Sequence, residues 1–246
     1  MRFTERSAAN EFLRAQNRRL YDLGAREMRR LMESLTDEER AARNACCPAW
    51  SNQDVVAHHI HFTGADDVPD SIMMALRETT QAAYDATRAE RDGWTAAGVE
   101  ARRDRSLQEL WDEWDSLRDQ NPDAFFPTVD LTMHLFDIEE SLGRTDKTRT
   151  ELAFDALLGY VTWFLVDKVD TAGQALNLEP TDVDHTLAFF DDAPIVTGSS
   201  YDLLRCVGGR RTRAQADHLL DWGDTPTEAR DLLSVYTWPA DSGVPA

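Results

Sequence analysis

The feature that most constrains the fold is a succession of long segments with helical periodicity in about the first 170 residues. In each segment, apolar residues recur at spacings of three and four, which places them on one face of a helix. The segments run from about Ser7 to Leu35, from Asn52 onwards, from Ser106 onwards, from Val129 to Leu142, and from about Thr148 to near Lys168. Long helices with few strand signals between them predict an up-and-down helical bundle.

Capping residues mark where several of these helices begin and end. Ser51 and Asp54 form an S-x-x-D capping box, which predicts a helix that starts at the next residue. Ser106 and Glu109 have the same spacing at the start of a later helix. Gly143 predicts the C-terminal cap of the helix before it.

The chain changes in character after Ala172. The runs "ALNLEP", "HTLAFF" and "APIVTG" are short, alternating or β-branched, and are bounded by Pro, Asp and Gly, which indicates strands. A short helix is expected from Ser199 to Val207, and Thr225-Pro226 opens another. We therefore expect a mainly α protein with two domains, a helical bundle over residues 1–171 and a small α+β domain over residues 172–246.

Composition excludes several classes of partner. The 45 acidic and 26 basic residues give a net charge of −19, which repels phosphate backbones and argues against nucleic acid. The sequence contains no run of about 18 apolar residues, so it predicts no membrane span. The first segment is amphipathic and lacks the apolar core of a signal peptide, so we expect a cytoplasmic protein. The three cysteines do not make a disulfide framework, although Cys47 is a candidate reactive thiol.

Two helical segments carry residue types that bind metal ions. The first contains His58, His59 and His61. In the second, Asp130 and His134 are four residues apart, so both side chains can reach one ion. Such a pair alone more often marks a solvated helix edge, but two imidazoles and one carboxylate would form a three-ligand set with an open fourth position, as in catalytic zinc sites.

Periodicity alone favours His59 over its neighbour as the ligand from the first segment. His59 lies nearest the centre of the apolar face formed by Val55, Val56, Ile60 and Phe62, and His58 lies at its edge.

Three motifs together resemble those of one family. They are "LTDEERAARNACCPAWSNQDVVAH", "DLTMHLFDIEESLGR" and "GSSYDLLRCVGGRRTRAQADHLLDWGDTP". In this order they resemble the motifs of the DinB-like mycothiol-dependent metalloenzymes, the maleylpyruvate isomerase family, and they extend over nearly the whole chain. The chain departs from the family pattern at Ala49, where glycine is usual, at the additional Cys46, and at Asp130, where glutamate is frequent.

The resemblance implies a DinB-like four-helix bundle followed by the small α+β domain. It implies that His58, and not His59, binds a divalent metal ion, expected to be zinc, together with Asp130 and His134. It also leaves a role for Asp137, which would orient an imidazole or, alternatively, form a salt bridge on the helix surface.

Two arginines are candidates for binding an anionic group. Arg210 matches an arginine of the third family motif, and its planar guanidinium would bind a carboxylate in bidentate fashion. A solvated arginine in a turn is the alternative for Arg210. Arg103, just before a helical segment, is a second candidate anion contact.

The implied activity is thiol chemistry on a small electrophilic substrate. Mycothiol, a low-molecular-weight thiol, would be the cosubstrate, and the outcome would be S-transfer or thiol-assisted cis–trans isomerisation, so the enzyme class is transferase or isomerase. A natural-product enzyme that exchanges a thiol and a non-catalytic metal-binding protein are the alternatives.

Overall fold

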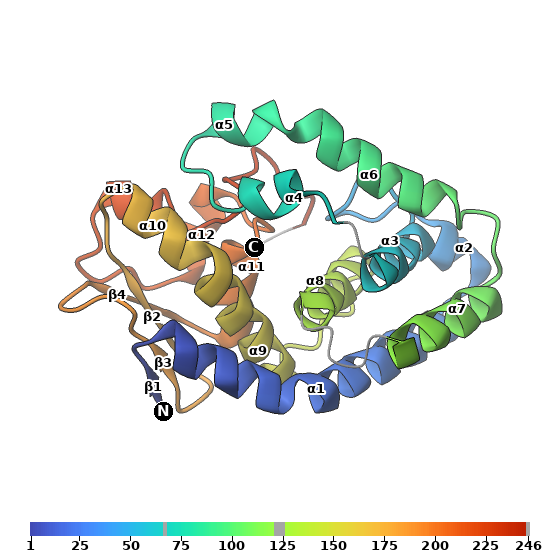
Figure 1. The fold of residues 1–246 in the computed structure, drawn as a ribbon, viewed down its shortest axis with the longest axis horizontal. Coiled ribbons are helices and arrows are strands. Elements are labelled where there is room, and N and C mark those ends of the chain that lie inside the picture. The colour runs from blue at the N-terminus through green and yellow to red at the C-terminus, as the bar shows by residue number, and fades with distance from the viewer. Residues whose placement is uncertain (66–67, 121–125, 245–246) are drawn as a thin grey trace. The chain divides into compact units, whose positions relative to one another are not determined.

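The computed structural model describes residues 1–65, 68–120 and 126–244, and it is mainly helical with one small sheet (Figure 1). The mainly α fold predicted from the sequence is therefore confirmed. The helices are α1 (Arg6–Ser34), α2 (Asp37–Ala41), α3 (Asn52–Gly64), α4 (Asp70–Ala75), α5 (Gln81–Ala86), α6 (Arg88–Glu100), α7 (Leu107–Gln120), α8 (Phe126–Ser141), α9 (Thr150–Tyr160), the π-helical segment η1 (Val161–Leu165), α10 (Val166–Thr171), α11 (Ser200–Val207), α12 (Arg213–Leu219) and α13 (Thr227–Arg230). The strands are β1 (Arg2–Phe3), β2 (Asn177–Pro180), β3 (Thr186–Leu187) and β4 (Ile195–Gly198).

The chain divides into two compact units that alternate along the sequence. Unit 1 comprises Met1–Ala15, Met73–Ala86 and Lys147–Ala246, and unit 2 comprises Gln16–Ile72 and Thr87–Asp146. The sequence indicated a single division after residue 171. These units differ from that division because α9, η1 and α10 belong to unit 1 with the residues that follow them, and so do Met1–Ala15 and Met73–Ala86.

Helix α3 is the centre of unit 2, where it packs against α6, α7 and α8. It begins at the predicted residue because the Ser51 hydroxyl accepts the Asp54 N–H and the Asp54 carboxylate accepts the Ser51 N–H. The approach of α6 to α3 requires a glycine, since a Cβ atom on Gly98 would lie 2.0 Å from the His61 ring. The capping hydrogen bonds thus fix the start of α3, and the small size of Gly98 allows α6 to pack closely against it.

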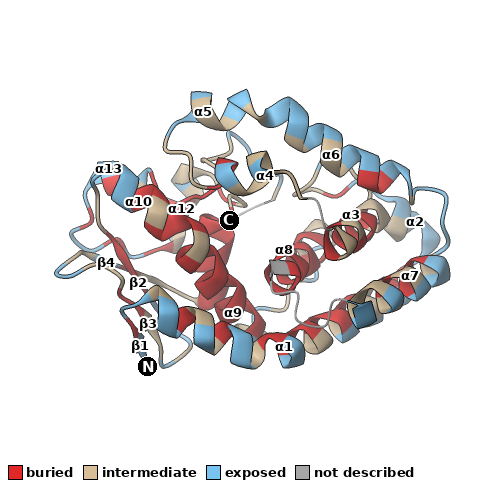
Figure 2. Ribbon diagram, in the orientation of Figure 1, coloured by how far each residue is buried: buried red, intermediate tan, exposed pale blue. Residues whose placement is uncertain are grey.

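Helix α8 is buried on nearly all sides (Figure 2). Leu131, Leu135 and Ile138 have no exposed surface, as expected for a core stripe. The same helix also buries charged and polar side chains, including Asp130, His134 and Asp137. Gly143 follows the helix with φ +64°, a left-handed conformation that glycine adopts without strain, so the predicted cap is confirmed.

Unit 1 contains the sheet and the helical run α9–η1–α10. The strand order is β1-β3-β2-β4, with β2 antiparallel to β3 and parallel to β4. The three strands predicted after Ala172 are confirmed, whereas β1 was not predicted, because two residues are too few to show alternation. Helices α2, α4, α5, α6 and α12 were also not predicted.

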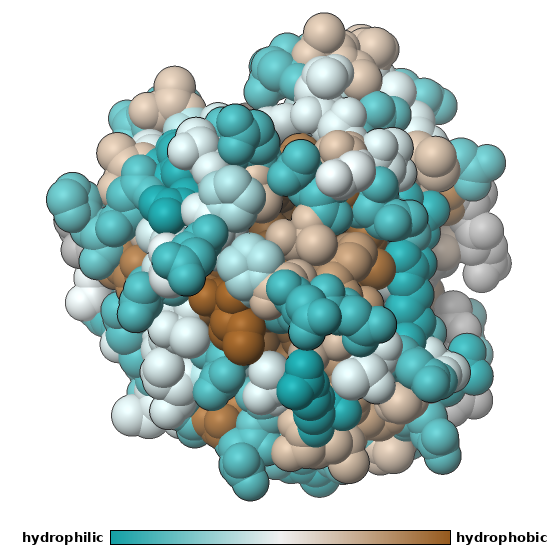
Figure 3. Space-filling model, turned by 90° about the vertical axis from the view of Figure 1, so that its left-hand side faces the viewer, coloured by the Kyte–Doolittle hydropathy of each residue, from teal (hydrophilic) through white to brown (hydrophobic). Residues whose placement is uncertain are grey.

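The surface is largely hydrophilic on the face shown in Figure 3, with hydrophobic areas in smaller patches. Among the described residues, the large apolar side chains with the greatest exposure are Met1, Met74 and Ile195. None of the described helices combines the length and apolar character needed to cross a membrane.

Lys168 is a buried cation in unit 1. Its side chain lies in the core, and its Nζ donates a hydrogen bond to the Ser234 carbonyl oxygen at 2.6 Å. Burial lowers the pKa of Lys168 from 10.5 to about 8, although the nearby charge of Glu78 opposes this shift. The folded chain therefore loses this proton at a lower pH than the unfolded chain does.

We expect this difference to make stability depend on pH. Below about pH 8 the lysine is charged in both states, and the cost of burying the charge is present in full. From about pH 8 towards pH 10 the unfolded chain holds more protons, so the free energy of unfolding rises by roughly 2 kcal/mol. Denaturant unfolding over this range should show the rise in the wild type and in Lys147→Met, which changes the exposed and only other lysine, but not in Lys168→Met. Parallel pH curves for the wild type and Lys168→Met would contradict the assignment.

Candidate metal centre

Three predicted ligands converge inside unit 2. His58 lies on α3, while Asp130 and His134 lie one helical turn apart on α8. Among the described residues, His58, Asp130 and His134 form a buried group that can hold a metal ion, because one donor atom of each lies within 4.8 Å of the others. The i,i+4 spacing on α8 and the packing of α3 against α8 bring the donors together.

The separations between these donor atoms match a coordination sphere better than a hydrogen-bond network. Asp130 Oδ1 is 3.4 Å from His134 Nε2 and 3.9 Å from His58 Nε2, and both distances are long for hydrogen bonds. Two such ligands around a tetrahedral zinc ion are roughly 3.4 Å apart. Both imidazoles thus direct Nε2 to the same carboxylate oxygen at distances suited to a shared cation.

Asp130 and His134 form a buried ion pair. Burial raises the pKa of Asp130, but the charge of His134 and a hydrogen bond from His59 outweigh it and hold the pKa well below its usual range. Burial likewise lowers the pKa of His134, but the charge of Asp130 and a hydrogen bond to Asp137 hold it well above its usual range. A metal ion at this site therefore competes with the proton on His134 Nε2.

His58 is kept neutral and is thus competent as a ligand. Burial lowers its pKa to about 3, with the charge of Asp130 acting in the opposite direction. Its ring lies 4.7 Å from the Trp50 ring and 5.0 Å from the His134 ring. Its buried Nδ1 atom has no hydrogen-bond partner in the described part of the chain. The Nε2 atom of the neutral His58 ring faces the Asp130 carboxylate but is too far from it for a good hydrogen bond. A cation between the two groups would fit this arrangement.

His59 belongs to a different part of the centre. It is fully buried, as its central position on the apolar face predicted, but its Nδ1 is 2.8 Å from Asp130 Oδ2. Which of the two binds a metal ion stays a prediction, but His58, and not His59, joins the buried donor group described above. The reason is that the period locates a side chain relative to the core, whereas the ring direction decides which carboxylate oxygen it meets.

The contacts behind His59 were not predicted from the sequence. Thr63 Oγ1 lies 3.3 Å from His59 Nε2 and 3.3 Å from the Tyr21 hydroxyl, which accepts a 2.6 Å hydrogen bond from Trp114 Nε1. These residues come from α3, α1 and α7. The only local signal was the i,i+4 spacing of His59 and Thr63, which gives no information about the other two helices.

Asp137 orients the imidazole of His134. Its Oδ2 lies 2.9 Å from His134 Nδ1, on the side of the ring opposite Nε2, and the carboxylate has no exposed surface. A surface salt bridge, the alternative considered for this residue, is therefore wrong. A carboxylate on the distal nitrogen of a metal-binding histidine fixes the ring and increases its basicity.

The two candidate anion-binding arginines have other contacts. Arg103 forms a surface ion pair with Glu100 at 3.0 Å. Arg210 lies in unit 1, where it donates a hydrogen bond to the Gly208 carbonyl oxygen and its guanidinium lies 5.7 Å from the centre of the Tyr236 ring. Their roles towards an anionic ligand stay predictions.

Comparison of the chain with models of protein families, with curated proteins and with solved structures found no match. A function for this chain is therefore inferred from the three sequence motifs and from the geometry of the centre.

We expect the group of His58, Asp130 and His134 to hold one zinc ion per chain in the purified protein. His58→Ala and His134→Ala should each lose the equivalent of zinc held by this group after dialysis, because the two remaining donors hold the ion weakly. Elemental analysis measures the content, and His218→Ala, which changes an exposed histidine of unit 1, is the matched control. Full zinc content in both site variants would exclude this centre.

We expect His59→Gln to keep one zinc ion but to bind it about 10- to 100-fold more weakly, because the variant loses the contact that orients Asp130. Competition with a chelator of known affinity measures the dissociation constant. Complete loss of zinc from His59→Gln, with retention by His58→Ala, would instead make His59 the ligand.

Proposed function

We propose that the protein is a metalloenzyme that uses mycothiol to act on a small electrophile. The observation that carries the proposal is the buried convergence of His58, Asp130 and His134, which are the residues that the family resemblance implies as ligands. The proposed ion is zinc, because imidazole and carboxylate donors in a three-residue set are typical of catalytic zinc sites.

The number of donors favours catalysis over a purely structural site. Structural zinc sites normally have four protein ligands, whereas catalytic sites have three and leave one position for water or substrate. In the buried group of His58, Asp130 and His134, three side chains supply the donors. The fourth position would thus accept a ligand from outside the chain.

Neighbouring residues hold the donors in place under this proposal. His59 Nδ1 contacts Asp130 Oδ2, and Asp137 Oδ2 accepts a hydrogen bond from His134 Nδ1. Trp50 and Phe62 lie against the His58 ring, with ring centres 4.7 and 6.3 Å away, and provide an apolar wall. The donors are therefore oriented before any ligand arrives, and water has little access to them.

The reaction would follow from activation of the thiol. When bound, a zinc ion would lower the pKa of the mycothiol S–H group, so that the thiolate forms near neutral pH. In S-transfer, a new carbon–sulfur bond forms and the leaving group of the electrophile departs. In isomerisation, the sulfur adds to an alkene, rotation occurs about the resulting single bond, and the sulfur leaves. Arg210 and Arg103 are the proposed contacts for an anionic group of substrate or thiol.

We expect mycothiol to bind the zinc-loaded protein at least about tenfold more tightly than the metal-free protein, because only a metal ion stabilises the thiolate over the thiol. Calorimetry on both forms measures the ratio. S-Methyl mycothiol is the matched ligand, since it keeps the sugar contacts but has no ionisable S–H group, and its affinity should not depend on zinc. Turnover of a small electrophile such as monochlorobimane should require both zinc and mycothiol.

Three results would contradict the proposal. Equal affinity of mycothiol for both forms would mean that the thiol does not reach the ion. Full turnover without thiol would point to metal-bound water as the nucleophile and to a hydrolase. Tight zinc binding with neither thiol binding nor turnover would favour a non-catalytic metal-binding protein.

A further inference from the structure

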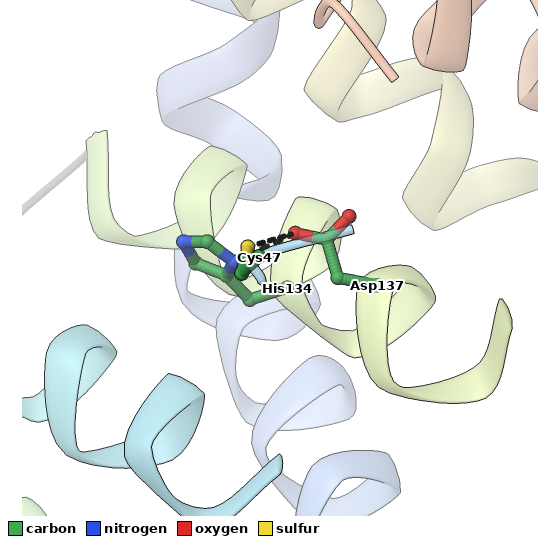
Figure 4. A group of neighbouring side chains, drawn as sticks. All are labelled: Cys47, His134 and Asp137. Atoms are coloured by element: carbon green, nitrogen blue, oxygen red, sulfur yellow. Dashed lines mark hydrogen bonds and ion pairs between the residues drawn. The ribbon is translucent and has the colours of Figure 1, made fainter. Parts of the chain in front are cut away.

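A second set of metal-binding donors lies on the other side of the His134 ring. Figure 4 shows Cys47, His134 and Asp137 with their side chains directed towards one another. The Cys47 Sγ atom is 3.5 Å from Asp137 Oδ2, which is 2.9 Å from His134 Nδ1. Donor atoms of all three residues lie within 4.8 Å of one another. Sulfur, oxygen and nitrogen donors therefore converge at one point.

These separations are close to those of a tetrahedral zinc site. With zinc–sulfur and zinc–oxygen bonds of about 2.3 and 2.1 Å, the two ligand atoms are roughly 3.6 Å apart. The observed distance between Sγ and Oδ2 is 3.5 Å. The nitrogen and oxygen donors need roughly 3.4 Å and would have to separate by about half an ångström, which small side-chain rotations can provide.

The loop that carries Cys47 is held in position by a fully buried asparagine. Asn44 Oδ1 accepts the backbone N–H groups of Cys46 and Cys47, each at 2.9 Å. Its Nδ2 donates to the Asp137 carbonyl oxygen and to the Asn52 side chain. The same side chain therefore connects the cysteine loop to α8 at Asp137 and to α3, so the thiol is positioned against the carboxylate.

The two donor sets use different atoms of one histidine. His134 directs Nε2 to Asp130 and Nδ1 to Asp137. Because the ring nitrogens point in opposite directions, two ions bound to them would lie on opposite sides of the ring. The sets otherwise share no residue, since the first is completed by His58 and the second by Cys47.

We propose that Cys47, Asp137 and His134 Nδ1 form a second metal position, for a thiophilic divalent ion, which can be occupied together with the first. Binding there releases two protons, one from the Cys47 thiol and one from His134 Nδ1, and His134 then bridges the two ions as an imidazolate. One divalent ion replaces two protons, so the net charge of the buried cluster does not change, and no additional charge has to be buried. A thiolate ligand favours ions such as zinc or cobalt over magnesium or calcium.

Titration of the metal-free, reduced protein with Co²⁺ tests the position, since a cobalt–thiolate bond gives a charge-transfer band in the near ultraviolet. The wild type should bind two equivalents and show the band. Cys47→Ser should bind one equivalent without the band. Cys46→Ser is the matched control, because the neighbouring Cys46 Sγ contacts Glu140 instead, and it should retain both equivalents and the band.

His58→Ala separates this proposal from the proposed function. It should abolish the first position and retain one equivalent with the band, whereas His134→Ala should abolish both positions. Circular dichroism confirms that each variant is folded. A single equivalent in the wild type, with or without the band, would overturn simultaneous occupation. A band that survives Cys47→Ser, or that is lost in Cys46→Ser, would overturn the assignment of the thiolate.

Discussion

The ion pair between Asp130 and His134 is the interaction on which the arrangement of unit 2 depends. Both side chains are almost fully buried, and a buried charge without a partner costs several kcal/mol. A second carboxylate, Asp137, is buried on the same helix and accepts a hydrogen bond from Nδ1, the other ring nitrogen of His134. Helix α8 can therefore occupy the core only in an orientation that keeps these groups together. The packing of α3 against it must leave room for the imidazole of His58.

The contacts around the ion pair extend to several other elements of unit 2. One series runs from Asp130 through His59 and Thr63 to Tyr21 and Trp114, and so connects α8 with α3, α1 and α7. A second series passes through Asn44 to the loop before α3. Polar groups that are fully hydrogen-bonded in a core give it one well-defined arrangement. Asp130 and His134 are consequently held by side chains that are themselves fixed, which is the requirement for a binding or catalytic site.

This organisation gives His134 a central chemical position. Its Nε2 belongs to the proposed catalytic metal centre, and its Nδ1 faces the carboxylate and thiol of the proposed second position. With a proton on Nδ1, Asp137 makes the imidazole a stronger donor to the first ion. With a metal ion on Nδ1, the two positions would be coupled directly through the ring. The state of Nδ1 would thus influence the charge on the first ion and the reactivity of a thiol bound there.

Features that depend on neighbours along the chain follow from the amino-acid sequence alone. The capping box of Ser51 and Asp54 specified the start of α3, and the four-residue spacing of Asp130 and His134 brought two donors together. Both follow from the geometry of a single helix. The tertiary structure alone places His58 in the buried donor group and His59 against the other carboxylate oxygen of Asp130, because these contacts depend on how two helices pack. The same holds for the cysteine loop against α8 and for the two units that alternate along the chain. Periodicity locates a side chain relative to the core, but the packing of separate elements decides what that side chain meets there.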